Sequence, residues 1–263
     1  MDLGLNDKVA LVTGGSEGIG LAAARSLAAE GARVVICARR PEVLERAAAE
    51  IRSVTGGEVF PVPADVAVAE QLEGLFDRVI GAYGRIDVLV NNAGTSAAGH
   101  FESVTDDAWQ ADLDVKLFAA IRCSRMAIPH MKAQGGGRII NVTNLGGKAP
   151  QARSMPTSVS RAAGIALTKA MSKDLASDNI LVDTVCIGLI KSGQHERRWE
   201  SRRGDGSSAS LDEWYVEMGQ RVPLGRVGER HEAGDVISFL ASERASYVTG
   251  VAINIDGGAS AVV

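Results

Sequence analysis

The sequence has few aromatic residues and few cysteines, and both scarcities exclude whole classes of protein. Aromatic side chains make up 4% of the 263 residues. The three cysteines, Cys37, Cys123 and Cys186, are widely separated, so they form neither a metal-ligand spacing nor the disulfide framework of a small secreted domain. Because they lie in apolar stretches, we expect buried free thiols, no metal site and a cytoplasmic protein.

Long apolar runs and an excess of charge are also missing. No stretch approaches the roughly 20 apolar residues that a membrane-spanning helix requires. Residues 1–7, MDLGLND, lack the basic and apolar regions of a signal peptide. The formal net charge of −4 does not favour binding to nucleic acid or to an acidic membrane surface. We therefore expect a small-molecule substrate, with neither nucleic acid nor membrane as a partner.

Short apolar runs alternate with longer amphipathic runs along the whole chain. The pattern predicts strands at 8–12, 33–37, 59–62, 87–91, 137–142, 181–186 and 251–255. It predicts helices at 18–30, 42–53, 68–83, 106–134, 156–177 and 231–242. Such alternation indicates an α/β protein with a doubly wound parallel sheet of about seven strands and helices on both faces. We expect residues 1–263 to form a single domain.

Segment 190–224 interrupts this alternation. It is polar, with glycine and serine at its centre, yet it contains two of the three tryptophans, Trp199 and Trp214, and also His195 and Tyr215. Positions 211, 214, 215 and 218 are apolar and recur at helical spacing, which predicts a short amphipathic helix. The segment is either a lid over a substrate or an irregular stretch whose helix packs on the core or on a neighbouring subunit.

A glycine-rich turn follows the first predicted strand. Residues 13–20 read TGGSEGIG, and they lead into the alanine-rich run 21–30. Gly14 permits a tight turn, Gly18 lets the backbone approach a pyrophosphate, and Gly20 lets the helix pack against the strand. The positive end of the helix then faces the phosphates. Strand, glycine turn and helix together predict a dinucleotide site of the Rossmann type.

Further motifs carry a resemblance to a known family. Asp65 and Val66 follow the third strand, residues 91–94 read NNAG, residues 137–142 read GRIINV, and Gly250 precedes a DGG at 256–258. With the glycine turn, these motifs resemble a short-chain dehydrogenase/reductase of the short single-domain type over essentially the whole chain. The resemblance implies an NAD(P)-dependent oxidoreductase and self-association as a tetramer or dimer. For the substrate we expect a small apolar carbonyl compound or, given the catalytic residues described below, an enone.

The same resemblance implies the cofactor contacts, with the loop after the sixth strand covering the substrate. The implied cofactor-binding residues are Gly14, Ser16, Gly18, Ile19, Gly20, Arg39, Asp65, Val66, Asn92, Ala93, Gly94, Arg161 and Gly188.

The end of the second predicted strand bears on the choice of cofactor. An acid there would bind the ribose hydroxyls and repel a 2′-phosphate. This chain instead has Arg39, whose guanidinium suits a phosphate, and Ser16 can add a hydroxyl contact. Glu17 argues in the opposite direction, since relatives that bind NADP often carry a basic residue at that position. On balance the chemistry favours NADP(H) over NAD(H).

The catalytic positions depart from the family pattern. The resemblance places the usual lysine at Arg161, the tyrosine at Thr157, the serine at Asn144 and the helix asparagine at Lys116. All four are replaced, and no tyrosine lies between positions 83 and 215. A threonine hydroxyl donates a hydrogen bond but is a far weaker acid than tyrosine, so general acid catalysis worth roughly 10²–10⁴-fold is in question.

Several explanations of this altered site stay open. The substrate can be an activated alkene beside a carbonyl, whose enolate Asn144 and Thr157 would stabilise. A replacement acid can come from His195 or Tyr215. Lys116 can pair with an acid such as Asp112, or donate a proton if buried. The other readings are a catalytically silent nucleotide-binding sensor or partner subunit, and a non-redox enzyme on the same scaffold.

Overall fold

In residues 1–204 and 210–263, which the computed structural model describes, seven parallel strands form one sheet in the order β3-β2-β1-β4-β5-β6-β7. The strands are β1 (Val9–Thr13), β2 (Arg33–Ala38), β3 (Val59–Pro63), β4 (Val88–Asn91), β5 (Gly137–Asn144), β6 (Ile180–Ile187) and β7 (Ala252–Ile255). The order reverses between β1 and β4, which leaves a crevice at the carboxyl ends of these strands. The predicted fold class is confirmed.

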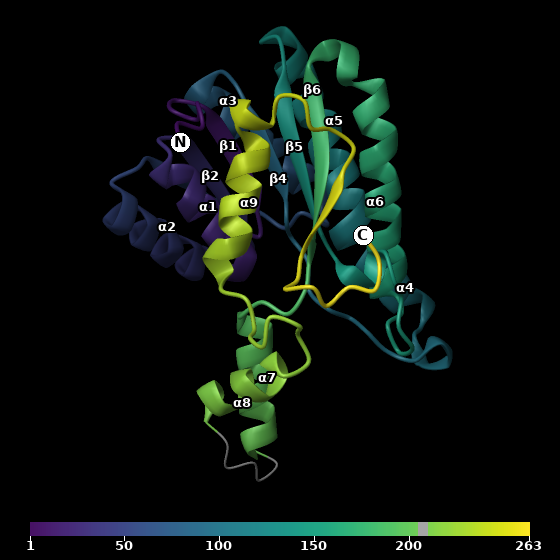
Figure 1. Cartoon of the computed structure of the whole chain (residues 1–263). Helices are drawn as coiled ribbons and strands as arrows, with labels where there is room; N and C mark the ends of the chain where they lie inside the picture. Colours follow the sequence, from purple (N-terminus) through teal and green to yellow (C-terminus); the bar gives the residue numbers. More distant parts are fainter. Residues whose placement is uncertain (205–209) are drawn as a thin grey trace.

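Helices cover both faces of the sheet (Figure 1). They are α1 (Gly18–Ala29), α2 (Pro41–Thr55), α3 (Ala69–Tyr83), α4 (Asp106–Leu113), α5 (Ala119–Ala133), α6 (Thr157–Asp174), α7 (Gly193–Gly204), α8 (Leu211–Gly219) and α9 (Arg230–Ala241).

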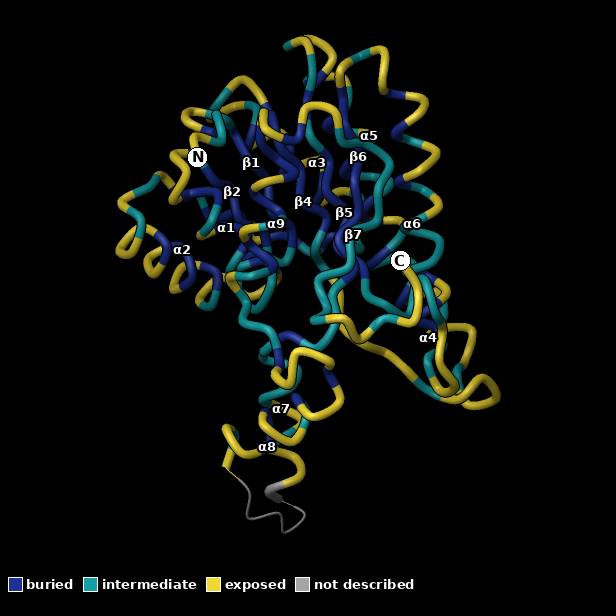
Figure 2. The backbone as a smooth tube through the Cα atoms, viewed as in Figure 1, coloured by how far each residue is buried: buried dark blue, intermediate teal, exposed yellow. Residues whose placement is uncertain are grey.

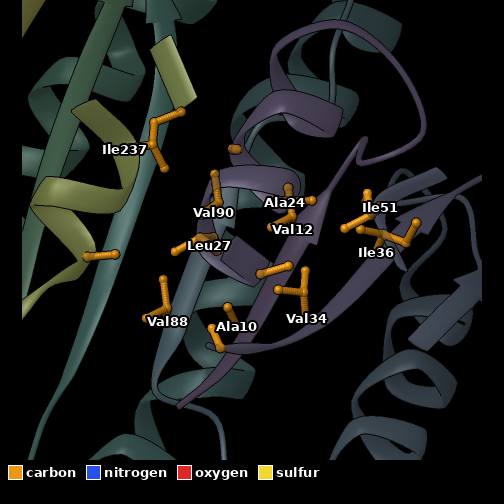
Figure 3. Close-up of a cluster of buried hydrophobic side chains, with 14 of the residues drawn as sticks. Ala10, Val12, Ala24, Leu27, Val34, Ile36, Ile51, Val88, Val90 and Ile237 are labelled. Atoms are coloured by element: carbon orange, nitrogen blue, oxygen red, sulfur yellow. The ribbon is translucent and has the colours of Figure 1, made fainter. Parts of the chain in front are cut away.

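Alternate residues of the strands feed two separate hydrophobic cores. Ala10 and Val12 of β1 pack with α1, α2 and α9, as Figure 3 shows, and Ile237 of α9 belongs to the same cluster. Val9 and Leu11 point to the opposite face and pack with α3 and α5. This follows from the period of two along a strand, and it explains why β1 is buried on both sides.

The predicted long helix over 106–134 is confirmed, because the chain is helical without a break over 106–133, but a π-helical turn, Asp114–Phe118, separates α4 from α5 within it. Lys116 lies in this turn. π-Helical turns inside α-helices recur at functional sites because the wider turn redirects side chains. Here the wider turn carries Lys116 to the buried side, where its side chain is only 1% exposed.

Segment 190–224 is more ordered than the predicted irregular stretch. The short helix expected around 211–218 is present as α8, but the first half of the segment is also helical, as α7. The two helices project beyond the carboxyl ends of the strands (Figures 1 and 2). Residues 205–209, which include most of the glycine- and serine-rich centre, lie outside the described residues.

Within the described residues, none of the helices combines the length and the apolar character needed to cross a lipid bilayer.

Candidate functional site

The glycine turn between β1 and α1 has the geometry of a phosphate cradle. Gly14 and Gly18 have φ angles of +65° and +59°, which only glycine adopts readily. A Cβ on Gly20 would lie 2.2 Å from the Gly14 carbonyl oxygen, so a larger residue would push α1 away. A Cβ on Gly18, in contrast, would have no heavy atom within 4 Å, so the backbone there faces open space.

The first turn of α1 also lacks a side-chain cap. Glu17 occupies the N-cap position, and its side chain accepts no hydrogen bond from the helix. The leading amide groups, including that of Ile19, therefore remain available for an anion at the positive end of the helix. The turn fits a dinucleotide pyrophosphate, which those amides and the Gly18 backbone would hold.

Asn92 fixes this cradle to the neighbouring strand. Its side-chain amide donates to the carbonyl oxygens of Thr13 at 2.9 Å and Gly14 at 3.1 Å. The Thr13 hydroxyl in turn accepts the backbone N–H groups of Asn92 and Ala93. Asn92 and Ala93 thus brace the turn through four hydrogen bonds, and this network ties β1 to the end of β4 at the crevice.

The end of β2 presents two arginines with different surroundings. Arg40 Nη2 lies 2.9 Å from Glu17 Oε2, so the acid that counted against a 2′-phosphate is neutralised by a cation. Arg39 is exposed and has no ion-pair or hydrogen-bond partner among the described residues. Ser16 lies partly buried in the same turn. This end of the site is therefore positive.

The remaining predicted cofactor residues lie at the carboxyl ends of the strands. The Asp65 carboxylate accepts the Ala67 amide at 3.0 Å, which shapes the loop after β3, and Val66 is buried. A Cβ on Gly188 would meet Asp256 at 2.6 Å, so glycine is needed where β6 ends. A Cβ on Gly94 would lie 2.9 Å from Arg161 Nη2 and 3.2 Å from Lys116 Cγ. Gly94, one of the predicted cofactor-binding residues, therefore adjoins two of the predicted catalytic positions.

Lys116 and Thr157 meet in the interior of the site. Lys116 Nζ donates to Thr157 Oγ1 at 3.0 Å and forms an ion pair with Asp112, one helical turn earlier. The predicted pairing with Asp112 is confirmed, and both side chains are 1% exposed. Burial lowers the pKa of Lys116, and the Arg161 charge lowers it further, while Asp112 raises it.

Two residues that sequence reasoning missed complete this cluster. Ser160 Oγ donates to Asp112 Oδ2 at 2.6 Å, and the backbone N–H of Ala97 donates to Thr157 Oγ1 at 3.0 Å. Ser160 lies three positions after Thr157 on α6, so the two share a helix face. Ala97 comes from the loop after β4. No sequence motif marks these contacts, because they depend on how that loop lies across α6.

Arg161 and Asn144 border the same region with unused hydrogen-bonding capacity. Arg161 Nη1 donates to the Val142 carbonyl oxygen at 2.7 Å, and burial lowers the pKa of Arg161 to about 10. Among the described residues, Arg161 Nε and Asn144 Oδ1 are buried without a hydrogen-bond partner. Orphaned buried polar atoms are uncommon, and here they fit groups of a bound cofactor or substrate.

The predicted lid residues form a separate cluster. Trp214 and Tyr215 are buried and pack with Val227, and Trp199 and Met218 lie against them. The His195 ring is 6.0 Å from Trp214 and 6.5 Å from Tyr215. Within the described residues no hydrogen bond joins His195 or Tyr215 to the Lys116 cluster. α8 therefore packs in a cluster of its own, which α7 and the chain on either side of segment 190–224, at Leu189 and Val227, complete.

Residues 8–203 match the family model for short chain dehydrogenase, so the chain belongs to the short-chain dehydrogenase/reductase family. It is 35% identical over 254 residues to the 3-oxoacyl-acyl-carrier-protein reductase of Thermotoga maritima, covering 97% of this chain and 98% of that protein.

Solved structures extend the likeness to the whole fold. The L-sorbose reductase of Gluconobacter frateurii, complexed with NADPH and L-sorbose, superposes with a TM-score of 0.96 at 32% identity and covers 100% of both chains. An NADPH-bound short chain oxidoreductase from Pseudomonas aeruginosa PAO1, containing an atypical catalytic center, superposes with a TM-score of 0.89 at 34% identity. The overlap covers 98% of this chain and 100% of that one. These likenesses identify an NAD(P)-dependent oxidoreductase.

Proposed function

We propose that the protein is an NADPH-dependent reductase of a small carbonyl or enone compound, working through an active site without the family tyrosine. The observation that carries this proposal is the position of Gly94, which lies against both Lys116 and Arg161. The proposed cofactor-binding residues therefore adjoin the residues at the catalytic positions. When bound, the reduced nicotinamide supplies the hydride. Two of the relatives described above are reductases of carbonyl compounds, which supports the same direction.

The preference for NADP(H) over NAD(H) rests on Arg39. Its guanidinium is exposed and unpaired among the described residues, and Arg40 offsets the charge of Glu17. A phosphate at the end of β2 would form charge-assisted hydrogen bonds with Arg39 and meet no uncompensated acid there. The L-sorbose reductase and the Pseudomonas oxidoreductase were both solved with NADPH, which agrees with this preference.

The substrate would lie between Asn144, Thr157 and Arg161. Asn144 has an amide that can donate to a developing oxyanion, and Arg161 places a permanent charge in the same region. Arg161 would also take the place of the family lysine at the cofactor ribose. An enone demands less proton donation at oxygen than a ketone, so it remains part of the proposed substrate class.

We propose that segment 190–224 serves as a lid on a single domain. Ion pairs with α9 hold its base: Glu196 pairs with Arg230, and Lys191 pairs with Glu229. Its aromatic cluster packs the two projecting helices together and joins them to Leu189 and Val227 at the two ends of the segment. Self-association as a tetramer or dimer is the accompanying proposal, and light scattering of the purified protein would measure it.

The test is NADPH oxidation, followed at 340 nm, with a panel of aliphatic ketones, 3-oxoacyl thioesters, ketoses and enones. We expect turnover of at least one compound, with NADH a poorer reductant. Turnover of ketones but of no enone would remove the enone version of the proposal.

A second candidate function, a nucleotide-binding sensor or partner subunit, is favoured by one observation. The ammonium of Lys116 makes two hydrogen bonds, both carboxylate oxygens of Asp112 accept one, and both side chains are closed to solvent. Tight NADPH binding without turnover of any panel compound would select this second function.

A further inference from the structure

The Thr157 hydroxyl accepts two hydrogen bonds and has its own hydrogen left over. The Ala97 amide and the Lys116 ammonium each donate to Oγ1 at 3.0 Å. A hydroxyl has two acceptor lone pairs and one donor, so both lone pairs are engaged. Among the described residues no acceptor receives the remaining hydrogen. Thr157 is therefore oriented as a donor, with a cation directly behind it.

Lys116 is held so that it can return a proton to that hydroxyl. Asp112, on α4, faces the ammonium from one side, and Ser160 donates to the second carboxylate oxygen at 2.6 Å. Arg161 is the other charged group packed against this cluster. Two hydrogen-bonded carboxylate oxygens fix Asp112, which in turn aims Nζ at Thr157. A nucleophile or base pinned by a third group in this manner is a recurring catalytic arrangement.

Thr157 and Arg161 lie one helical turn apart on α6, so they face the same region. Gly94, in the loop after β4, lies close to the Arg161 guanidinium and to the Lys116 side chain. A Cβ at this position would be 2.9 Å from Arg161 Nη2 and 3.2 Å from Lys116 Cγ. The Thr157 hydroxyl and this loop are thus joined through Lys116 itself. A substrate oxygen that accepts the free Thr157 hydrogen would lie beside the place where hydride is delivered.

We propose that Thr157 and Lys116 form a proton relay that replaces the family tyrosine, a proposal that rests on the reductase function above. The carbonyl carbon gains a hydride from the reduced dinucleotide, and the carbonyl oxygen gains the Thr157 hydroxyl proton. The Lys116 ammonium passes a proton to Thr157 Oγ1 in the same step, so threonine never carries a full negative charge. After the product leaves, a water at the vacated substrate position returns the proton to neutral Lys116 through the Thr157 hydroxyl. Asp112 and Ser160 act as positioning residues.

This arrangement answers the objection that threonine is too weak an acid. The acid that loses the proton overall is Lys116, whose pKa is lowered from its ordinary value by burial. A general acid works best with a pKa near the working pH, and a lysine shifted downward moves toward that range. The permanent charge of Arg161 favours the loss as well, because it repels the ammonium.

The matched variants for the test are Thr157→Val, which removes the hydroxyl while keeping the shape, and Thr157→Ser, which keeps it. With the carbonyl compound that the wild type reduces best, we expect Thr157→Val to lose at least about 100-fold in kcat and Thr157→Ser to stay within about tenfold. NADPH affinity and the unfolding temperature are measured for both, to show that the site is still formed. Equal kcat for the two variants would overturn the relay while leaving the reductase function intact.

A second readout separates a relay from mere packing. Removing the Asp112 carboxylate, as Asp112→Asn, takes away the group that favours the charged ammonium, so the pKa of Lys116 falls. The decline of kcat at high pH should then shift to lower pH, whereas a structural role would lower kcat at every pH alike and would overturn the proposal.

Carbon-13 NMR of labelled lysine side chains reports the same titration without turnover, with Lys116 assigned from Lys116→Arg. We expect Lys116 to titrate at lower pH than the exposed lysines and lower still in Asp112→Asn. A Lys116 signal that titrates with the exposed lysines in both proteins would contradict the relay. If the wild type binds NADPH but turns over no compound, the proposed reductase function is wrong. This result is obtained before any variant is measured, so it is distinct from a failure of the relay.

Discussion

Arg40 and Glu17 form an ion pair of 2.9 Å that ties the glycine turn to the end of β2. The pair leaves Arg39 as the exposed cation beside the turn, without an ion-pair partner in the described part of the chain. We therefore expect the Arg39 guanidinium to decide the preference between NADPH and NADH. Arg39 can be substituted without removing an ion pair or hydrogen bond of the described residues.

Substituting Arg39→Asp should reverse the cofactor preference. A charge-assisted hydrogen bond is worth about 1.5–3 kcal/mol, so the Kd for NADPH should rise about 10- to 100-fold, while the Kd for NADH stays level or falls. Fluorescence titration with both dinucleotides measures the change. Arg46→Asp, the same charge change at an exposed position of α2, is the control. Equal losses for NADPH in the two variants would refute the assignment.

Gly18→Ala should weaken cofactor binding by more than its effect on the fold explains. Gly18 and Gly56 both have positive φ angles, +59° and +69°, and both have open space around a Cβ. An alanine in this conformation costs about 1–2 kcal/mol, so both variants should lose similar stability. Only at position 18 would the methyl group lie in the proposed pyrophosphate site. We expect Gly18→Ala to weaken NADPH binding at least tenfold and Gly56→Ala to leave it unchanged; calorimetry that shows no difference between them would refute the cradle.

Asp183 predicts a pH dependence of stability. It is 2% exposed, and burial raises its pKa to about 6. The pKa of Asp183 in the folded protein lies above the value of about 3.9 in the unfolded chain, so folding favours the protonated carboxyl. Its contribution to the free energy of unfolding is therefore full below pH 4 and is lost as pH rises through 6.

Asp183→Asn, which keeps an acceptor for the Val251 amide, should therefore stabilise the protein more at pH 8 than at pH 5, by about 1.5 kcal/mol. Urea unfolding at the two pH values measures the free energies of unfolding. An equal effect at both pH values would argue against a raised pKa.

The lid residues should not supply the catalytic proton. Burial lowers the pKa of His195 and raises that of Tyr215, and neither side chain is hydrogen-bonded to the Lys116 cluster in the described residues. His195→Gln and Tyr215→Phe should therefore retain kcat within about threefold and keep its pH profile. Loss of the high-pH limb of the kcat profile in Tyr215→Phe would instead assign the acid to that hydroxyl.

Local patterns in the sequence predicted where the glycine turn lies, between the first strand and the first helix. The glycine turn, Asn92 and Gly94 depend on short stretches whose spacing is fixed by one strand and one helix start. The pairing of Lys116 with Asp112 was also predictable, because residues four apart on a helix are neighbours. The strand and helix positions followed from hydrophobic periodicity in the same way.

Contacts between distant segments were not predictable. Ala97 meets Thr157 across 60 positions, and Ser160 meets Asp112 across 48. The π-helical turn around Lys116 has no signal of glycine or proline, so 106–134 read as one helix. The pairing of Arg40 with Glu17 depends on how the end of β2 lies beside the glycine turn. Each of these features depends on packing between segments that no local pattern records.

Hydride transfer despite the altered catalytic positions is the proposal on which the others depend. Its most direct test uses NADPH with both C4 hydrogens of the nicotinamide replaced by deuterium, incubated with the protein and each ketone, ketose, thioester and enone of the panel. Mass spectrometry of the products then shows whether deuterium has reached carbon. We expect a reduced product that contains one deuterium, formed by the wild type and formed more slowly by Gly18→Ala. Tight binding of NADPH with no deuterium in any product would contradict it.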